Sequence, residues 1–169
     1  MRANRTSRLL KSKIKGLGAL TAIIAGLKRR GKKIVFTNGC FDLLHYGHVK
    51  YLADAKKIGD ILVVAINSDA SVRKIKGSKR PIVNERDRLS LIAALESVDY
   101  VLLFNEDTPL EVIEKIKPDI LVKGADWARD KIAGSSIVLG AGGKVATIKL
   151  VRGRSTTNLI KKIAKTFHR

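Results

Sequence analysis

Residues 35–48 read VFTNGCFDLLHYGH and contain, in order, the end of a strand, a turn and the start of a helix. The apolar run at residues 34–36 is rich in β-branched and aromatic side chains, which predicts a buried strand. An Asn-Gly turn follows it, and a helical pattern begins near His48. His45 and His48 therefore share one face at a helix entrance, where free backbone N–H groups and a partial positive charge favour phosphate.

The histidine pair has three interpretations. Neutral or protonated imidazoles can donate hydrogen bonds to phosphate oxygens. A metal site would need a third ligand, and the only other histidine, His168, is at the C-terminal end. A structural role is the third interpretation. Gly39 and Gly47 bracket the pair and allow close backbone approach, which favours phosphate chemistry, and no residue is assigned as a metal ligand.

Apolar runs and helical patterns alternate along the rest of the chain. Strands are predicted at residues 61–66, 100–104, 120–122 and 145–151, and helices at 48–59, from Asn84, from Pro109 to before Pro118, at 137–139 and after Ser155. Thr108, Pro109 and Glu111 are expected to supply a cap, a first-position proline and a capping-box glutamate. This alternation, with strands apolar on both faces, indicates a doubly wound parallel α/β sheet whose ligands bind beyond the carboxyl ends of the strands.

The stretch from Gly39 to His48, a glycine followed by Phe-Asp and then His-x-Gly-His, resembles the signature of the cytidylyltransferase-like nucleotidyltransferases. From about residue 17 to the C-terminus the sequence resembles in particular the heptose 1-phosphate adenylyltransferases. The other supporting stretches are TNGCFD (37–42), VAINSD (64–69), Lys76-Gly77 with Arg80-Pro81, LVKGAD (121–126) and STTN (155–158). The resemblance implies a Rossmann-like sheet of five parallel strands in the order 3-2-1-4-5, the HxGH nucleotidyltransferase fold.

The resemblance also implies a reaction, the transfer of AMP from ATP to D-glycero-β-D-manno-heptose 1-phosphate, which gives ADP-heptose, a lipopolysaccharide inner-core precursor, and pyrophosphate. The main alternative enzyme is a cytidylyltransferase acting on glycerol 3-phosphate or a related phosphate. Those cytidylyltransferases carry Arg-Thr-Glu-Gly before the Ser-Thr pair, whereas this sequence has Leu-Val-Arg-Gly at residues 150–153, which leaves Arg152 one place out of register with a triphosphate-binding arginine.

The implied partners are ATP, a sugar 1-phosphate and Mg²⁺ bridging the phosphates. The bifunctional heptose enzymes carry a sugar-kinase domain that this sequence lacks, so a separate heptose kinase is expected upstream. Relatives are commonly dimers, so a homodimer is expected.

The resemblance assigns residues to roles. His45, His48 and Lys76 are expected to be catalytic, although the basic segment containing Lys76 could also be a solvated lysine run. The residues expected to bind the nucleotide are Thr37, Asn38, Gly39, Cys40, Phe41, Gly47, Lys123, Gly124, Asp126, Trp127, Ser155 and Thr156. The residues expected to bind the sugar phosphate are Asp42, Asn67, Arg80 and Arg88. Asp42 could instead be a structural cap, and Trp127 a packing residue.

The 169 residues are 45% hydrophobic, which fits one compact domain. A single cysteine, Cys40, cannot form an internal disulfide and fits the cytoplasm. The net charge of +19 is typical of proteins that bind nucleic acid or anionic membranes. A basic RNA-binding module is therefore the non-enzyme alternative, but it needs stacking platforms that a 5% aromatic chain hardly supplies, so no specific nucleic acid is expected. No apolar run approaches the ~18 residues of a membrane span.

The N-terminal segment is basic and then apolar, as in a signal or transit peptide. The apolar residues between Leu17 and Leu27 recur at helical spacing, however, and Gly31 is a plausible C-cap. We therefore expect a mobile basic tail at residues 1–11, and a nucleotidyltransferase domain at 12–169 that begins with an amphipathic helix at 12–31 packed on the body.

Overall fold

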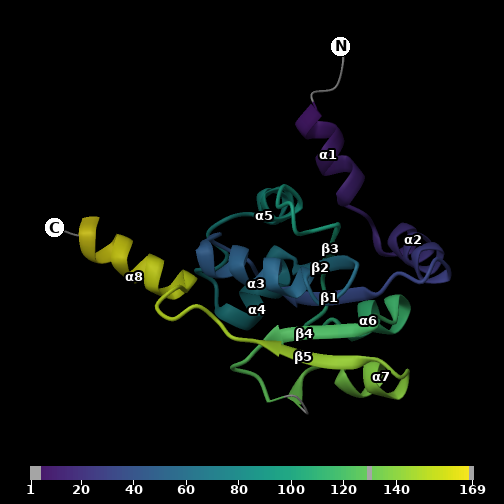
Figure 1. Ribbon diagram of the computed structural model, residues 1–169. Coiled ribbons are helices and arrows are strands. Elements are labelled where there is room, and N and C mark those ends of the chain that lie inside the picture. Colours follow the sequence, from purple (N-terminus) through teal and green to yellow (C-terminus); the bar gives the residue numbers. More distant parts are fainter. Residues whose placement is uncertain (1–4, 129–130, 168–169) are drawn as a thin grey trace.

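The computed structural model describes residues 5–128 and 131–167. Five parallel strands form one sheet in the order β3-β2-β1-β4-β5, which confirms the predicted architecture (Figure 1). The strands are β1 (Ile34–Gly39), β2 (Ile61–Asn67), β3 (Tyr100–Phe104), β4 (Ile120–Gly124) and β5 (Lys144–Ile148). Because β1 lies between β2 and β4, the winding direction reverses at β1, and a ligand is expected beyond its carboxyl end.

Helices cover both faces of the sheet. On one side are α2 (Leu17–Arg29), α6 (Leu110–Ile116) and α7 (Ser135–Gly140), and on the other are α1 (Arg5–Lys13), α3 (Tyr46–Lys56) and α5 (Glu85–Ala93). Successive strand residues alternate between two cores: Phe36 packs with Leu20 and Ile113, while Val35 packs with Leu52. All five are fully buried, and each such side chain contributes about 1.5–3 kcal/mol to the free energy of unfolding.

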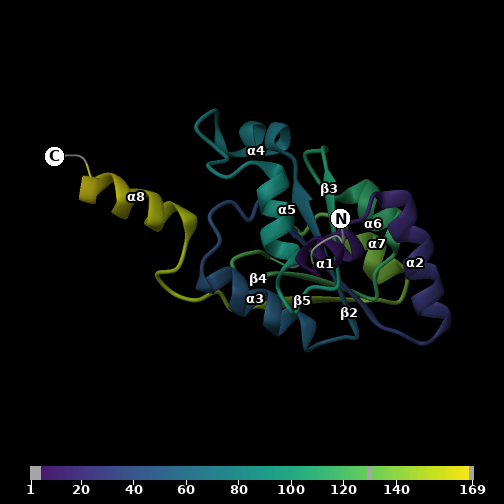
Figure 2. The same ribbon diagram turned by 90° about the horizontal axis from the view of Figure 1, so that it is seen from above.

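Two helices lie outside this sandwich. The first is α4 (Asp69–Lys76), which follows β2 directly, so Lys76 is the last residue of a helix and not part of a loop as the sequence had suggested. The second is α8 (Thr156–Phe167), which projects from the body in both ribbon views (Figures 1 and 2) and has no buried residue. The fifth strand also ends earlier than predicted, at Ile148.

The N-terminal segment differs from the expected tail and single helix. Residues 1–4 of the expected tail, like His168, lie outside the described residues, but α1 begins at Arg5 and α2 only at Leu17. Between the helices, Ile14 forms a parallel bridge with Val101 at the β3 edge. The segment is ordered because Ile14 packs on the core beside α5 and its neighbour Lys15 donates an N–H to Val101 O at 2.9 Å. It thereby covers a sheet edge that would otherwise expose unpaired backbone groups.

No helix in the described ranges is both long enough and apolar enough to cross a membrane.

Candidate active site

His45 and His48 lie where β1 passes into α3. His45 is the N-cap residue of α3 with an extended backbone, and His48 donates its N–H to His45 O at 2.9 Å in the first turn. Their rings stack with centroids 3.8 Å apart and an interplanar angle of 17°, and the Phe41 ring meets His48 edge-on at 5.3 Å. A Cβ at Gly47 would lie 2.9 Å from the His45 ring, so the stacked position requires glycine.

Three of the four imidazole nitrogens are buried without a hydrogen-bond partner in the part of the chain that the structure describes. Both ring nitrogens of His45 and Nδ1 of His48 have no hydrogen-bond partner among the described residues, and the same is true of the Asn38 side-chain oxygen. Buried polar atoms without partners are rare, because leaving one unsatisfied costs about 1–3 kcal/mol. All three side chains line the same cavity, so their free atoms mark where a polar ligand fits.

Both histidines are neutral at pH 7 in the absence of a ligand. Burial, helped by the neighbouring His45, lowers the pKa of His48 to about 4. Burial also lowers the pKa of His45, and the Arg154 guanidinium lowers it further. Each neutral ring therefore offers one N–H donor, and an arriving polyanion would raise both pKa values again.

The lowered pKa of His48 predicts that the folded protein loses stability in acid and that His48→Asn removes this part of the loss. Because the pKa of His48 is about 4 when folded and near 6.5 when unfolded, the unfolded chain binds more protons between these values. The cost to stability is thus absent above about pH 6.5 and grows as the pH falls to 4. From pH 7 to pH 5, wild type should lose about 2 kcal/mol more than His48→Asn, or roughly 4–8 °C in Tm. Equal losses in thermal melts of the two proteins would contradict the burial of a neutral His48.

The histidine pair lines a cavity of about 680 Å³ at the carboxyl ends of the strands. Loops after all five strands contribute to it, as the doubly wound fold predicts. The cavity brings together 17 of the 19 predicted site residues, and only Thr37 and Arg88 are absent from its lining. The Thr37 hydroxyl is buried against the Tyr51 hydroxyl at 2.8 Å, so its prediction as a nucleotide-binding residue is corrected to a packing role.

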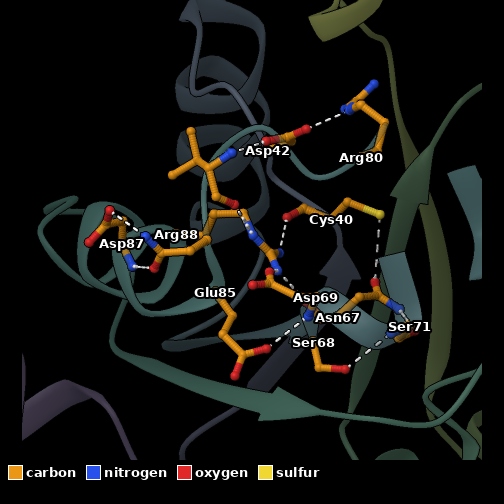
Figure 3. A network of polar contacts seen from close by, with 12 residues as sticks. Cys40, Asp42, Asn67, Ser68, Asp69, Ser71, Arg80, Glu85, Asp87 and Arg88 are labelled. Carbon is orange, nitrogen blue, oxygen red and sulfur yellow. Dashed lines mark hydrogen bonds and ion pairs between the residues drawn. The ribbon is translucent and has the colours of Figure 1, made fainter. Parts of the chain in front are cut away.

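Arg88 is fully buried and forms the centre of a polar network (Figure 3). Its guanidinium donates to Cys40 O at 2.6 Å, to Asn67 O at 2.8 Å, to Val83 O at 3.0 Å and to the Asp69 carboxylate at 2.8 Å. Arg88 thus fastens the ends of β1 and β2 to the start of α4. Its expected contact with substrate is wrong for this structure, because each guanidinium nitrogen already donates to a protein oxygen.

Asp42 lines the cavity, but its carboxylate already accepts hydrogen bonds from other residues of the chain. It accepts hydrogen bonds from Ile82 N at 2.9 Å and Val83 N at 2.8 Å, and it pairs with Arg80 Nε at 2.5 Å. Burial alone would raise the pKa of Asp42, but these donors outweigh it and hold the pKa below its usual value. Of the two interpretations that the sequence left open, substrate binding and a structural cap, the structure favours a structural role, because Asp42 holds the loop that follows α4.

The loop after β4 faces the histidines across the switch point. Lys123 is largely buried, donates to Asn38 O at 3.2 Å and lies 5.8 Å from the Trp127 ring centroid. Burial lowers the pKa of Lys123 to about 8, although Asp126 opposes the shift. Trp127 is 51% exposed, so its ring is available to stack on a ligand and is not a core packing residue.

The entrance of α8 closes the cavity on the same side. Ser155 Oγ accepts from Asn158 N at 3.1 Å, and Thr156 Oγ1 donates to Leu43 O at 3.5 Å, so both hydroxyls are held at the helix start. Burial raises the pKa of Cys40, which lines the cavity as a neutral thiol and not as a nucleophile.

The sequence missed several lining residues. They are Tyr51, Ile75, Asp107, Thr108, Pro109, Lys131, Ala133, Leu150, Val151, Arg154 and Thr157. Arg154 is the most informative, because it lies against Gly47 and lowers the pKa of His45. Counting from the Ser-Thr pair had drawn attention to Arg152, whereas the turn at residues 152–153 brings Arg154 to the cavity.

Comparisons with known proteins agree with this geometry. The sequence model of the family "Cytidylyltransferase-like" matches residues 36–162. The chain is 55% identical over 156 residues to "Bifunctional protein HldE" of Geobacter metallireducens and 56% identical over 156 residues to the protein of the same name of Citrifermentans bemidjiense. Each alignment covers 92% of this chain and 32% of the relative, so the chain spans about a third of the length of these curated relatives.

A solved structure is also similar, that of the lipopolysaccharide core biosynthesis protein from Thermoplasma volcanium GSS1. The two chains are 34% identical with a TM-score of 0.59, and the match covers 73% of this chain and 100% of the other.

Proposed function

The chain belongs to the cytidylyltransferase-like family, and from that premise we propose that it transfers AMP from ATP to D-glycero-β-D-manno-heptose 1-phosphate. The observation that carries nucleotidyl transfer is the stacked pair of histidines that line the cavity, three of whose ring nitrogens are buried without a hydrogen-bond partner among the described residues. The sugar acceptor is supported by the relatives, which include a lipopolysaccharide core biosynthesis protein, and by the resemblance of the sequence to heptose 1-phosphate adenylyltransferases.

In the proposed reaction an oxygen of the sugar 1-phosphate attacks the α-phosphorus of ATP in line with the bond that breaks. A bond forms between that oxygen and the α-phosphorus. The bond from the α-phosphorus to the α,β-bridging oxygen breaks, and pyrophosphate leaves with this oxygen and its electron pair. Because a phosphate monoester is already a nucleophile near pH 7, no general base is required. Catalysis rests on alignment and on stabilising negative charge.

His45 and His48 donate hydrogen bonds to the triphosphate and stabilise charge on the phosphoryl oxygens. Lys76, which also lines the cavity, adds a positive charge, and Ser155 and Thr156 offer hydroxyl and backbone N–H donors at the start of α8. Trp127 stacks on the base, with Lys123 and Asp126 beside it.

Mg²⁺ fits this site as an ion that arrives with the nucleotide. In the part of the chain that the structure describes, no three His, Cys, Asp or Glu side chains are grouped to hold a metal, and the Asp42 carboxylate is already occupied. Mg²⁺ commonly keeps its waters and binds substrate phosphates with few protein ligands. When bound, the ion would neutralise charge on the phosphate chain.

We propose that a separate heptose kinase acts upstream, in the cytoplasm, to supply the sugar 1-phosphate. We also propose that the chain forms a homodimer. The C-terminal helix supports this proposal, because Ile163 and Phe167 are 52% and 79% exposed on its apolar face.

Pyrophosphate release measured with purified protein tests the proposed activity. We expect turnover with ATP and D-glycero-β-D-manno-heptose 1-phosphate in the presence of Mg²⁺, and at least tenfold lower kcat/KM when CTP replaces ATP or glycerol 3-phosphate replaces the heptose. If only CTP with glycerol 3-phosphate turned over, nucleotidyl transfer would stand but the adenylyl and heptose assignments would be wrong.

A further inference from the structure

The positive charge of the chain lies in its two terminal segments. Residues 1–41 carry 11 lysines and arginines, residues 131–169 carry nine, and neither segment has an acidic residue. The 89 residues between them carry 14 basic and 15 acidic side chains. Binding of an anionic substrate accounts for little of the excess, because Lys131 and Arg154 are the only basic residues described in the terminal segments that line the cavity.

Helix α8 is the part of the basic C-terminal segment that extends from the body. None of its 12 residues is buried, and both ribbon views show it directed away from the sheet (Figures 1 and 2). At 1.5 Å per residue its length is about 18 Å. An isolated helix of this length is marginal in water, because most helices are stabilised by packing of an apolar face. A partner that covers this face would therefore stabilise α8.

The side chains of α8 separate into two faces, because an α-helix has about 3.6 residues per turn. The apolar face consists of Leu159, Ile160, Ile163 and Phe167, and the basic face of Lys161, Lys162 and Lys165. Ile163 and Phe167 are 52% and 79% exposed. The three lysines are also exposed, and none forms a salt bridge within the described ranges.

Three kinds of partner could cover α8, and its two faces distinguish them. Nucleic acid would pair with the lysines but leave the apolar face in water. A second copy, as in the proposed homodimer, could cover the apolar face, but it brings a net charge of +19 to a basic helix. An anionic lipid surface suits both faces, because it takes up the apolar side of a helix and attracts lysines through its phosphates.

We infer that α8 docks the protein on the surface of an anionic phospholipid bilayer, with the helix axis in the plane of the membrane. The apolar face enters the boundary between headgroups and acyl chains, and the lysines remain among the headgroups and the solvent. The basic N-terminal segment adds long-range attraction to the surface. Away from a bilayer, the same face stays available to the homodimer. This docking does not depend on the proposed nucleotidyl transfer.

Vesicle sedimentation tests the docking. Wild-type protein should bind phosphatidylcholine vesicles that contain about 30 mol% phosphatidylglycerol at least tenfold more tightly than vesicles of phosphatidylcholine alone, because lysines near an anionic surface strengthen binding. Two variants address the two faces, the apolar variant Ile163→Ser/Phe167→Ser and the basic variant Lys161→Gln/Lys162→Gln/Lys165→Gln. Each should bind the mixed vesicles at least tenfold more weakly than wild type.

Matched variants elsewhere remove the same number and kind of side chain. Ile82 and Leu139 are each 56% exposed, so Ile82→Ser/Leu139→Ser is the control for the apolar variant. Lys33→Gln/Lys79→Gln/Lys144→Gln is the control for the basic variant, because these lysines are exposed and do not line the cavity. Both controls should bind the mixed vesicles within about threefold of wild type. All four variants should keep the wild-type Tm within a few degrees, because none loses a buried side chain.

Several outcomes would overturn the docking. Wild-type protein might fail to bind the mixed vesicles or bind both kinds equally, and an apolar variant that bound as tightly as wild type would reduce the contact to general charge attraction. If the apolar variant became monomeric in sedimentation velocity but kept its vesicle binding, the face would belong to a second copy. Binding of single-stranded RNA in place of vesicles, lost in the basic variant and kept in the apolar one, would assign α8 to nucleic acid.

Discussion

His48→Ala is expected to lower kcat by about a thousandfold and to leave the Tm at pH 7 within a few degrees of wild type. Removing one preorganised donor to a developing phosphoryl charge typically costs 10²–10³ in kcat, and His48 also positions His45 by stacking at 3.8 Å. Stability should change little, because the His48 ring nitrogen Nδ1 makes no hydrogen bond that the substitution would break. Steady-state kinetics and thermal melts measure both quantities.

The control for His48 is its neighbour Tyr46, which is 59% exposed and does not line the cavity. Tyr46→Ala should keep kcat within about twofold. Because the two histidines act as one unit, the double variant His45→Ala/His48→Ala should be little worse than either single variant. If His48→Ala instead unfolded the protein and Tyr46→Ala did not, the histidine would be structural and the enzyme assignment would lose its main support.

The pattern of apolar runs was enough to predict the sheet. Strands buried on both faces, such as residues 61–66, are typical of parallel sheets, and the helical crossovers predicted between successive strands favour a parallel, doubly wound arrangement. α4 was missed because DASVRKIK has basic residues at three of its eight positions and buries only Ser71 and Val72. A helix of this composition is formed by its capping and tertiary bonds and not by an apolar stripe.

Residue roles were predicted less well than residue locations. Arg88 was expected at the substrate because of the family resemblance, and only the folded chain shows four oxygens converging on its guanidinium. Thr108 carried a sequence signal for capping that its position after β3 overrode. The rule that loops beyond strand carboxyl ends line the site would have identified both Asp107 and Thr108.

Lys76→Ala is expected to lower kcat/KM for ATP about a hundredfold, with little change in Tm. Lys76 ends α4, lines the cavity and forms no salt bridge within the described residues. The helix that carries it is firmly fixed: Ser68 caps Ser71 N, Glu85 accepts from Asp69 N, and Asp42 holds the following loop. A lysine on a fixed helix can contact the phosphates at little entropic cost. Its removal should therefore reduce the stabilisation of the transition state and lower kcat/KM.

Lys79 provides the matched control for this prediction, because it lies three residues further along, in the loop after α4, is also exposed and does not line the cavity. In a chain of net charge +19, any lysine near the entrance attracts ATP, and this long-range effect is screened by salt. We expect Lys79→Ala to stay within twofold of wild type, and the Lys76→Ala defect to persist at 0.3 M salt, where the Debye length is roughly 6 Å. If Lys76→Ala and Lys79→Ala lowered kcat/KM equally, and both defects vanished with salt, Lys76 would act by general electrostatic attraction. The positive charge at the phosphates would then come from another residue, and Arg154, beside His45, is the candidate.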